Sequence, residues 1–182
     1  MNRMKKVLCA FLLLAGGMEA TPYLNPGLIG FKDGNWIGTD HLYNIGNSFH
    51  VEVEVVQPEP ASFSLSEALI KKEIVSLLET KGIQVTREIT EASPPLPLFH
   101  FLFFALPVGD KIVLSCEGRV IEQVKLGRVV LPEGTYFQGV TWESSALLQT
   151  SPAKVEANAN RLARKIASNF LDKYEYYRSL KR

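Results

Sequence analysis

The three histidines, His41, His50 and His100, are the side chains of this sequence best suited to bind a metal ion or to transfer a proton near neutral pH. A metal site needs ligands that converge, but no two of these histidines are two or four residues apart and no cysteine lies near them. His50 alternates with Glu52 and Glu54, so we expect it on the exposed polar face of a strand. His100 lies inside an apolar run, where we expect a hydrogen-bonded histidine in the core or at a sheet edge. The sequence therefore predicts no metal site.

Motifs for nucleophilic catalysis and for phosphate binding are also absent from the sequence. There is no Gly-x-Ser-x-Gly elbow, no Walker loop and no Gly-x-Gly-x-x-Gly turn, and the glycines at 27, 30, 34 and 38 have other spacings. Ser144 and Ser145 follow Trp142 along a predicted strand, where packing explains them. Glu52 and Glu54 share one strand face, where they are explained as solvated charges. We therefore predict no catalytic residue and no cofactor.

The two cysteines, Cys9 and Cys116, predict no structural disulfide. Cys9 lies in the N-terminal apolar run, so its removal with that run would leave Cys116 alone. Cys116 shares one side of a period-2 pattern with Ile112, Leu114 and Val120. We expect it to be a buried, inert thiol rather than a nucleophile.

The first twenty residues have the three parts of a secretory signal. Basic residues at 3, 5 and 6 precede an apolar run at 7–15, which is shorter than the roughly 20 residues of a bilayer span. Small residues follow, and cleavage after Gly17 or Ala20 fits them. A lipid anchor would need a cysteine directly after the run, whereas Cys9 lies inside it. We expect a soluble periplasmic protein without lipid, and a short buried or membrane-anchoring helix is the alternative.

Composition and charge limit the partners. A chain of 182 residues with 46% hydrophobic and 21% charged residues is typical of one globular domain. Its net charge of +1 becomes −1 without residues 1–20, because that segment holds three basic residues and one acidic residue. Such a protein has no electrostatic reason to bind nucleic acid. No other segment approaches 18 continuous apolar residues, so we expect no transmembrane segment, while peripheral association with the outer membrane stays open.

Hydrophobic periodicity predicts two amphipathic helices. The first begins with a capping box, Ser64-Leu-Ser-Glu67, and ends at Gly82, which we expect in the left-handed conformation with Ile83 folded back onto the last turn. The second begins at Ser151-Pro152. Its apolar stripe comprises Val155, Ala159, Leu162, Ile166, Phe170, Tyr174 and Tyr177.

Strand patterns occupy five segments, at 48–55, 83–89, 98–106, 111–124 and 136–148. The segment 98–106 is almost wholly apolar, which is typical of a central strand covered on both faces or lying at an interface. The order β-α-β-β-β-β-α predicts an α+β fold, with a largely antiparallel sheet of about four to five strands and two amphipathic helices on one face. The domains we expect are the signal at 1–20, an irregular arm at 21–47 and a single α+β domain at 48–182.

Aromatic residues mark two candidate regions of partner contact. Tyr174, Tyr176 and Tyr177 lie near the end of the second helix, and only Tyr176 is outside its apolar stripe. Ring packing near a helix end is the simpler interpretation, and an exposed partner-binding patch is the alternative. The arm at 21–47 carries five glycines and four aromatic residues, including Trp36. We expect an ordered arm with one short strand and rings docked on the body, with a ligand- or partner-contacting arm as the alternative.

Three stretches of the chain carry a resemblance to a diffuse group of small exported bacterial envelope proteins. They are residues 64–85, Thr141-Trp142-Glu143-Ser144 and Asn169-Phe170-Leu171-Asp172-Lys173-Tyr174, within a similarity that spans 48–178. The pattern resembles lipoproteins that assist lipopolysaccharide assembly or serve as auxiliary parts of lipid transporters, and the N-terminal domain of a periplasmic translocation protein. This resemblance implies an accessory role in an envelope complex. It supplies no catalytic residues, and the chain lacks the acylated cysteine of the lipoproteins.

Three classes of function follow from these features. We predict an exported, non-enzymatic binding or assembly protein that is an accessory component of an envelope complex, with an envelope protein as its partner. The alternative is a periplasmic carrier of a small ligand or lipid, which would have a pocket between the helices and the strand at 98–106. A second alternative is an unrecognised enzyme, which would have buried polar side chains converging in one cleft.

Overall fold

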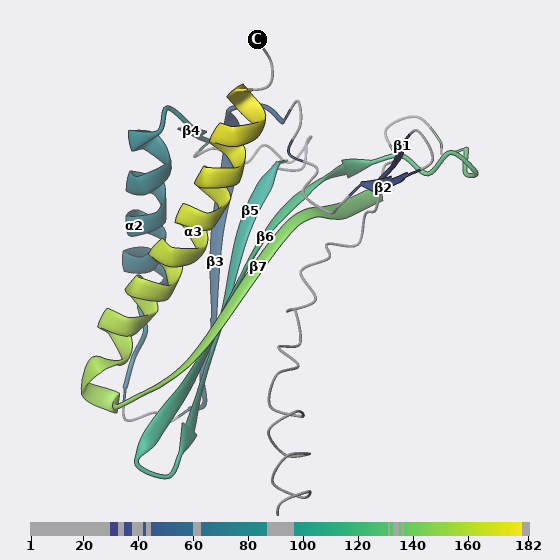
Figure 1. Ribbon diagram of the computed structural model, residues 1–182. Coiled ribbons are helices and arrows are strands. Elements are labelled where there is room, and N and C mark those ends of the chain that lie inside the picture. Colours follow the sequence, from purple (N-terminus) through teal and green to yellow (C-terminus); the bar gives the residue numbers. More distant parts are fainter. Residues whose placement is uncertain are drawn as a thin grey trace, which may run out of the picture.

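The computed structural model of the chain describes residues 30–32, 35–37, 42, 45–59, 63–86, 97–130, 132, 135 and 137–179. A five-stranded sheet and two helices form its main body (Figure 1). The predicted signal at 1–20 and its cleavage positions lie outside the described residues. The strands are β3 (Ser48–Val56), β4 (Gln84–Val85), β5 (Leu98–Val108), β6 (Lys111–Val124) and β7 (Phe137–Thr150). The helices are α2 (Glu67–Thr80) and α3 (Val155–Ser179), and a 3-10 turn, η1 (Pro152–Lys154), precedes α3.

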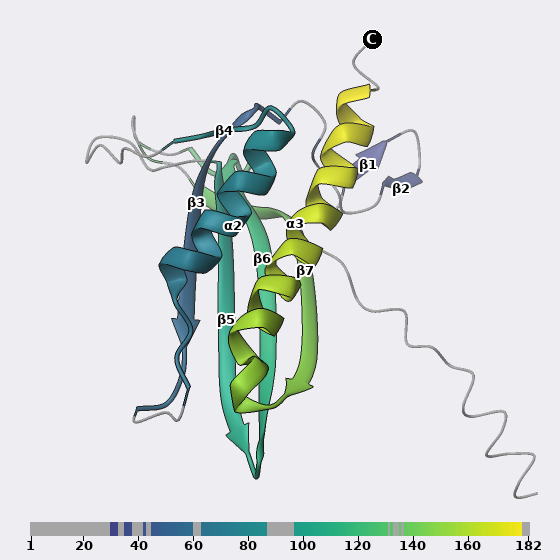
Figure 2. The same cartoon turned by 90° about the vertical axis from the view of Figure 1, so that its left-hand side faces the viewer.

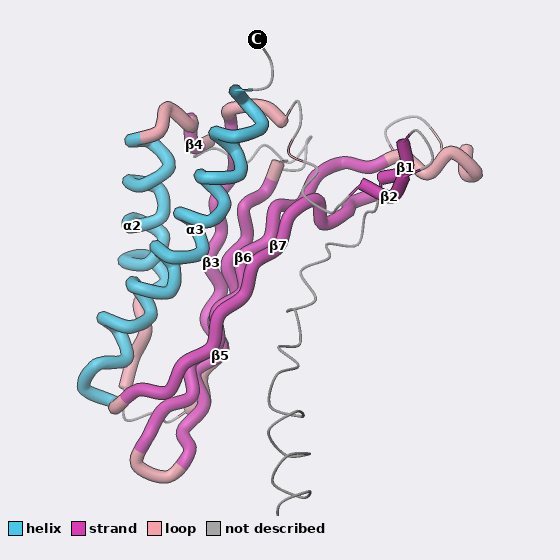
Figure 3. Tube along the Cα trace, in the orientation of Figure 1, coloured by secondary structure: helices cyan, strands magenta, loops and turns pink. Residues whose placement is uncertain are grey.

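Both helices pack on the same face of the sheet. Figure 2 looks onto this face and shows α2 and α3 in front of the strands, and Figure 3 shows the two layers from the side. No helix in the described part of the chain covers the opposite face, and none is long and apolar enough to span a membrane. The predicted α+β fold, its order of elements and its two-helix layer are therefore confirmed.

The sheet is mixed, which corrects the prediction of a largely antiparallel one. The strand order is β4-β3-β5-β6-β7, and β3 pairs in parallel with both β4 and β5. Only the pairs β5–β6 and β6–β7 are antiparallel. The reason is that α2 returns the chain to the end of the sheet at which β3 began, and a strand that follows such a crossover lies parallel to the first.

Two short paired strands lie within the expected arm. They are β1 (Gly30–Lys32) and β2 (Asn35–Ile37), which pair in antiparallel register with Phe31 opposite Trp36. We expected one short strand here, and the structure has two. The side chain of Trp36 lies outside the described part of the structure, so its predicted contact with a partner stays a prediction.

The start of α2 differs from the predicted capping box. Ser66, not Ser64, is the N-cap, and its hydroxyl accepts a hydrogen bond from the Leu69 amide at 3.3 Å. Glu67 is the first helical residue, and its carboxylate accepts from the Val55 amide of β3 at 2.9 Å. The capping box fails because Glu67 bonds to the sheet instead of reaching back to the helix start. Leu65, next to the cap, is buried.

The end of α2 follows the prediction. Gly82 has a φ of +74°, its amide donates to the Glu79 carbonyl, and the Ile83 amide donates to the Leu78 carbonyl. These two bonds, together with the buried side chains of Ile83 and Leu78, form a Schellman motif. The cap also explains why β4 is only two residues long rather than covering 83–89. Ile83 belongs to the helix end, and residues 87–90 are not described.

The core lies between the helices and the inner face of the sheet. The Phe170 ring of α3 lies 4.7 Å from Phe99 and 5.3 Å from Trp142, measured between ring centroids. At Gly118 of β6 an added Cβ would lie 2.5 Å from Cγ2 of Ile166, so α3 needs a glycine there to approach the sheet. Each predicted stripe residue from Val155 to Tyr174 is buried, and Tyr177 is partly buried against the core. The stripe prediction is confirmed.

Strand β5 is central, as predicted, but only one of its faces is covered. Phe99, Phe101 and Phe103 point toward the helices and are fully buried. On the other face Phe104, Leu106 and Val108 are 39%, 51% and 55% exposed. Coverage on both faces is therefore wrong for this strand, and the interface alternative stays a prediction.

Candidate interaction surface

The outer face of the sheet presents side chains from β3, β5, β6 and β7, and we call it the open face. Strand alternation and register place these side chains in rows across the four strands. Two rows are mainly polar, and a third is mainly apolar. In strand order they are Glu52, His100, Arg119 and Glu143; then Glu54, Leu102, Glu117 and Ser145; then Val56, Phe104, Ser115 and Leu147.

A cluster of three charged residues lies in the polar rows. Nη2 of Arg119 lies 2.7 Å from Oε1 of Glu117, and Nε of Arg119 lies 3.5 Å from Oε2 of Glu143. The second contact is an ion pair without a well-formed hydrogen bond, because the buried Nε makes none. One guanidinium thus lies between two carboxylates, and all three side chains are about one-quarter to one-third exposed.

The Glu143 carboxyl is the unusual acid of this cluster. Burial raises its pKa above the ordinary value, and a hydrogen bond and the charge of Glu117 raise it further. Arg119 opposes this shift but does not cancel it. The Glu143 carboxyl therefore keeps its proton to a higher pH than an exposed glutamate does.

Sequence reasoning missed this cluster. Glu117 and Arg119 are two residues apart, which signals a shared strand face, but Glu143 joins them only through the register of β7 on β6. The Arg119 guanidinium is paired with both carboxylates, and no set of three metal-ligating His, Cys, Asp or Glu side chains converges within the described residues. The arrangement supplies local charge and one carboxyl, that of Glu143, with a raised pKa.

The histidines differ from one another in their surroundings. His100 lies on the open face of the central strand β5, 17% exposed, with Nε2 3.4 Å from Oε2 of Glu54, rather than in the core or at a sheet edge as expected. His50 corrects our expectation of an exposed residue, since it is only 6% exposed. Its Nδ1 lies 3.2 Å from the Thr86 carbonyl oxygen, because the chain that leaves β4 runs beside the start of β3. His41 lies outside the described residues.

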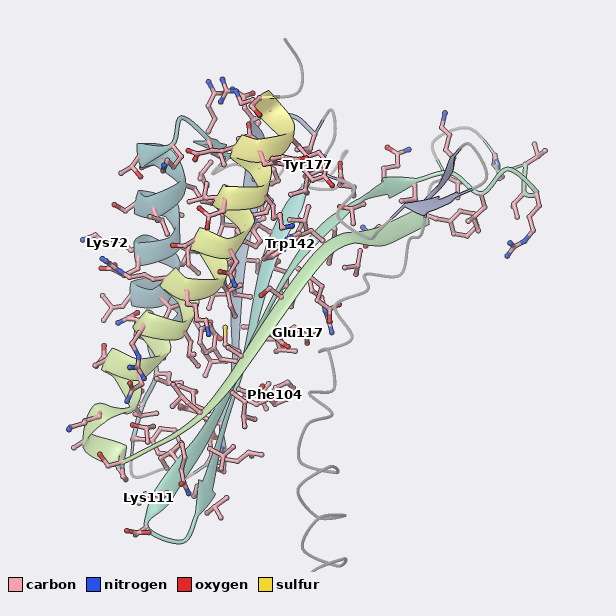
Figure 4. All side chains as sticks on the ribbon, viewed as in Figure 1. Lys72, Phe104, Lys111, Glu117, Trp142 and Tyr177 are labelled. Atoms are coloured by element: carbon pink, nitrogen blue, oxygen red, sulfur yellow. The ribbon has the colours of Figure 1, made fainter. Side chains whose placement is uncertain are left out.

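An apolar patch adjoins the charged cluster, toward the β5–β6 hairpin. It consists of Val56, Phe104, Leu106, Val108 and Leu147, which are between 39% and 72% exposed. Val56 and Phe104 are direct partners in register, and Ser115 separates Phe104 from Leu147. Figure 4 shows Phe104 and Glu117 pointing away from the helices, whereas Trp142 points toward them. The open face is thus apolar at one end and acidic beside it.

The tyrosines near the end of α3 divide between core and surface. Tyr174 is 3% exposed, and its ring centroid lies 5.8 Å from that of Phe170. Tyr176 is 57% exposed, and its ring centroid lies 5.3 Å from that of the partly buried Tyr177. Burial of Tyr174 agrees with ring packing and removes it from any contact patch, which leaves Tyr176 as the exposed ring.

A small cavity of about 260 Å³ lies beside Tyr174. It is lined by Leu42, Ile45, Gly46, Asn47, Tyr174 and Arg178, so it lies between the end of α3 and the chain leading into β3. It is not the pocket between the helices and β5 that a carrier would need. In that layer the Phe99, Phe101 and Phe103 side chains are fully buried, and the Phe99 ring contacts the rings of Phe101 and Phe170.

Cys116 is buried in the inner face of β6, as predicted. Burial raises the pKa of its thiol, and the neighbouring Glu117 charge raises it further. The thiol is therefore held in its unreactive protonated form.

Comparison with known proteins adds little to this description. No family model and no curated protein matches the sequence. A solved structure described as "Crystal structure of uncharacterized protein" is similar over 76% of this chain and 95% of that chain, at 10% identity and a TM-score of 0.28. A likeness at this TM-score supports no conclusion, so the functional argument rests on the surface described above.

Proposed function

We propose that this chain is an exported, non-enzymatic binding or assembly protein of the bacterial cell envelope, acting as an accessory component of an envelope complex. The observation that carries the proposal is the apolar patch on the open face. Monomeric proteins rarely expose large contiguous apolar surfaces, and those that do use them mostly for binding. Five neighbouring large apolar side chains on one sheet face favour contact with another protein.

The neighbouring charges support a protein partner. Specific interfaces combine an apolar centre with a polar rim, and charges at the rim select the partner and its orientation. Here Glu52, Glu54, Glu117 and Glu143 outnumber Arg119 and His100 beside the patch. We therefore expect the partner to bring apolar side chains flanked by basic ones.

The filled core favours an assembly role over a ligand carrier. A carrier pocket of ordinary size has a volume of about 300–1,000 Å³ and is lined mainly by apolar side chains. The space between α3 and β5 is instead occupied by the rings of Phe99 and Phe170, whose centroids lie 4.7 Å apart.

Site-specific photo-crosslinking in cells tests the proposed surface. A photoreactive amino acid at Leu106, which is 51% exposed on the open face, should crosslink to an envelope protein. Leu69 is a matched control, since it is 49% exposed on α2 in the opposite layer and should yield no such product. Equal products from both positions, or none from Leu106, would contradict the assignment of the open face as the binding surface.

Export is tested separately at the N-terminus. If residues 1–20 are a cleaved signal, N-terminal sequencing of the protein from the periplasmic fraction should begin at residue 18 or 21. Metabolic labelling with a fatty acid should give no incorporation. An intact Met1, or a labelled protein, would contradict export as a soluble unlipidated protein.

A further inference from the structure

Strand β7 is an edge strand with one unpaired side. It is 14 residues long, pairs with β6, and has no second partner within the described residues. Ser145 and Gln149 are exposed along it, and Leu147 is 72% exposed. A long edge of this kind presents free backbone amides and carbonyls to any other extended strand.

The opposite edge of the sheet is protected against pairing with a further strand. There β4 pairs with the first two residues of β3, and the Glu67 carboxylate accepts the Val55 amide at 2.9 Å. These contacts occupy backbone groups that another strand would need. Proteins commonly protect free edges in such ways, or with Lys, Pro and bulges.

Strand β7 carries little protection. It contains no lysine, arginine or proline, and its one charged residue, Glu143, is paired with Arg119. The register shift between β6 and β7 falls at Val120/Ile121, opposite the stretch between Val140 and Trp142. Residues 142–150 are therefore free of irregularity and form a regular nine-residue edge.

We propose that two copies of this chain pair through β7 in antiparallel register, with the two-fold axis at Ala146. This register uses the whole regular stretch, because Ala146 is its midpoint and Trp142 then pairs with Thr150 of the second copy. Glu143 lies opposite Gln149, and Ser145 opposite Leu147, so no like charges face each other. The two Leu147 side chains lie diagonally across the axis, within reach of each other.

Close to the proposed axis, the helix layer leaves room for this pairing. Ile166 of α3 lies over Gly118 of β6, close to the proposed axis. The two copies of β6 would be separated by three strand spacings, or roughly 14 Å. At the level of Ile166 this separation exceeds the roughly 8–10 Å between the axes of packed helices, while farther along, α3 also packs on β7 through Phe170 and Trp142. The two sheets would join into one, and the apolar patch would continue across the axis.

A second copy suits this edge better than an unrelated strand because the nine-residue stretch complements itself about its own midpoint. The proposal is independent of the partner that binds the open face. Its test is therefore the oligomeric state of the purified protein, whereas the crosslinks from Leu106 test the envelope partner.

Sedimentation equilibrium over a range of concentrations should detect a dimer of the full chain. Leu147→Lys places a charge at the pairing edge and should raise the dimer dissociation constant at least tenfold. Leu106→Lys is the control, since Leu106 lies on the same open face but on β5, and it should leave the constant unchanged. Urea midpoints measured at a concentration at which the wild type is monomeric should be unchanged for both variants, which would show that they remain folded.

Disulfide trapping tests the register, in a Cys9→Ser background that leaves Cys116 buried. An equimolar mixture of Ser145→Cys and Leu147→Cys chains should form a linked dimer faster than either variant alone, since opposed strand residues lie within disulfide range. A wild-type monomer at every concentration would overturn the proposal. So would a dimer that is weakened by Leu106→Lys but not by Leu147→Lys, or an edge that crosslinks in cells only to a different protein.

Discussion

Glu143 shows at the residue scale how strand register creates chemistry that a sequence does not display. Its carboxyl lies beside Arg119 of the neighbouring strand β6 and forms a hydrogen bond with Glu117. Glu117 comes 26 positions earlier in the chain. Burial and the second carboxyl both favour its protonated form. Ionisation of the Glu143 carboxyl therefore lowers the stability of the folded protein.

The stability of a Glu143→Gln variant relative to wild type should therefore depend on pH. The folded pKa of Glu143 lies above its ordinary value of 4.5, so the stability it contributes is present at low pH and lost as the pH rises through the folded pKa. The urea midpoint of Glu143→Gln should rise relative to wild type between pH 4 and pH 7. Ser145→Ala, which changes no carboxyl, should show the same difference from wild type at both values. A Glu143→Gln difference that does not change with pH would place Glu143 in a solvated environment.

Sequence reasoning was accurate for single residues where the pattern is local. The period-2 pattern around Cys116 correctly predicted its burial, because alternation along one strand decides which face a side chain takes. The prediction for His50 was wrong although its strand was right, since β4 and Thr86 lie beside it and come more than 30 residues later.

At the element scale, the two ends of α2 show which capping signals are decisive. The C-terminal signal depends on Gly82 alone, because a positive φ strongly favours glycine, and the structure follows it. The N-terminal stretch offers two serines, Ser64 and Ser66, and local sequence does not separate them. The sheet decides between them, because the Glu67 carboxylate bonds to Val55.

Substitution of each serine should separate the two caps. Ser66→Ala removes the acceptor for the Leu69 amide and should cost about 0.5–2 kcal/mol of unfolding free energy. Ser64→Ala is the matched control and should be close to neutral, because Ser64 is exposed and precedes the cap. Urea denaturation of both variants measures the difference. A larger loss for Ser64→Ala would restore the predicted capping box.

Strand direction was the part of the fold that the sequence did not predict. The strand segments were identified by alternation or, at 98–106, by a continuous apolar run, and both are local properties. Whether neighbours run parallel depends on which strands pair, and β5 inserts between β3 and β6 rather than extending a meander. β4 ends and β5 begins beside the start of β3, as the Thr86 amide bonding to the Phe49 carbonyl and the His50 amide bonding to the Pro97 carbonyl show.

At the scale of the whole molecule, the two faces of the sheet have opposite roles. The inner face is closed by α2 and α3 over a continuous aromatic core. The open face keeps Phe104 and Leu106 exposed, which lowers the stability of the isolated chain relative to one with that surface buried. This asymmetry explains how one almost wholly apolar strand can serve both the core and a binding surface.

Helix α3 carries both core residues and an exposed ring that is a candidate for partner contact. Paired substitutions should separate these two roles. Ile166 is fully buried against Gly118, so Ile166→Ala should cost about 2–5 kcal/mol of unfolding free energy. Tyr176 is 57% exposed, so Tyr176→Ala should leave the urea midpoint nearly unchanged. If the exposed ring contacts the envelope partner, Tyr176→Ala should also weaken recovery of the complex, as Leu106→Glu should on the open face. Loss of recovery with Leu106→Glu alone would confine the contact to the open face, whereas equal destabilisation by Tyr176→Ala and Ile166→Ala would place the whole helix end in the core.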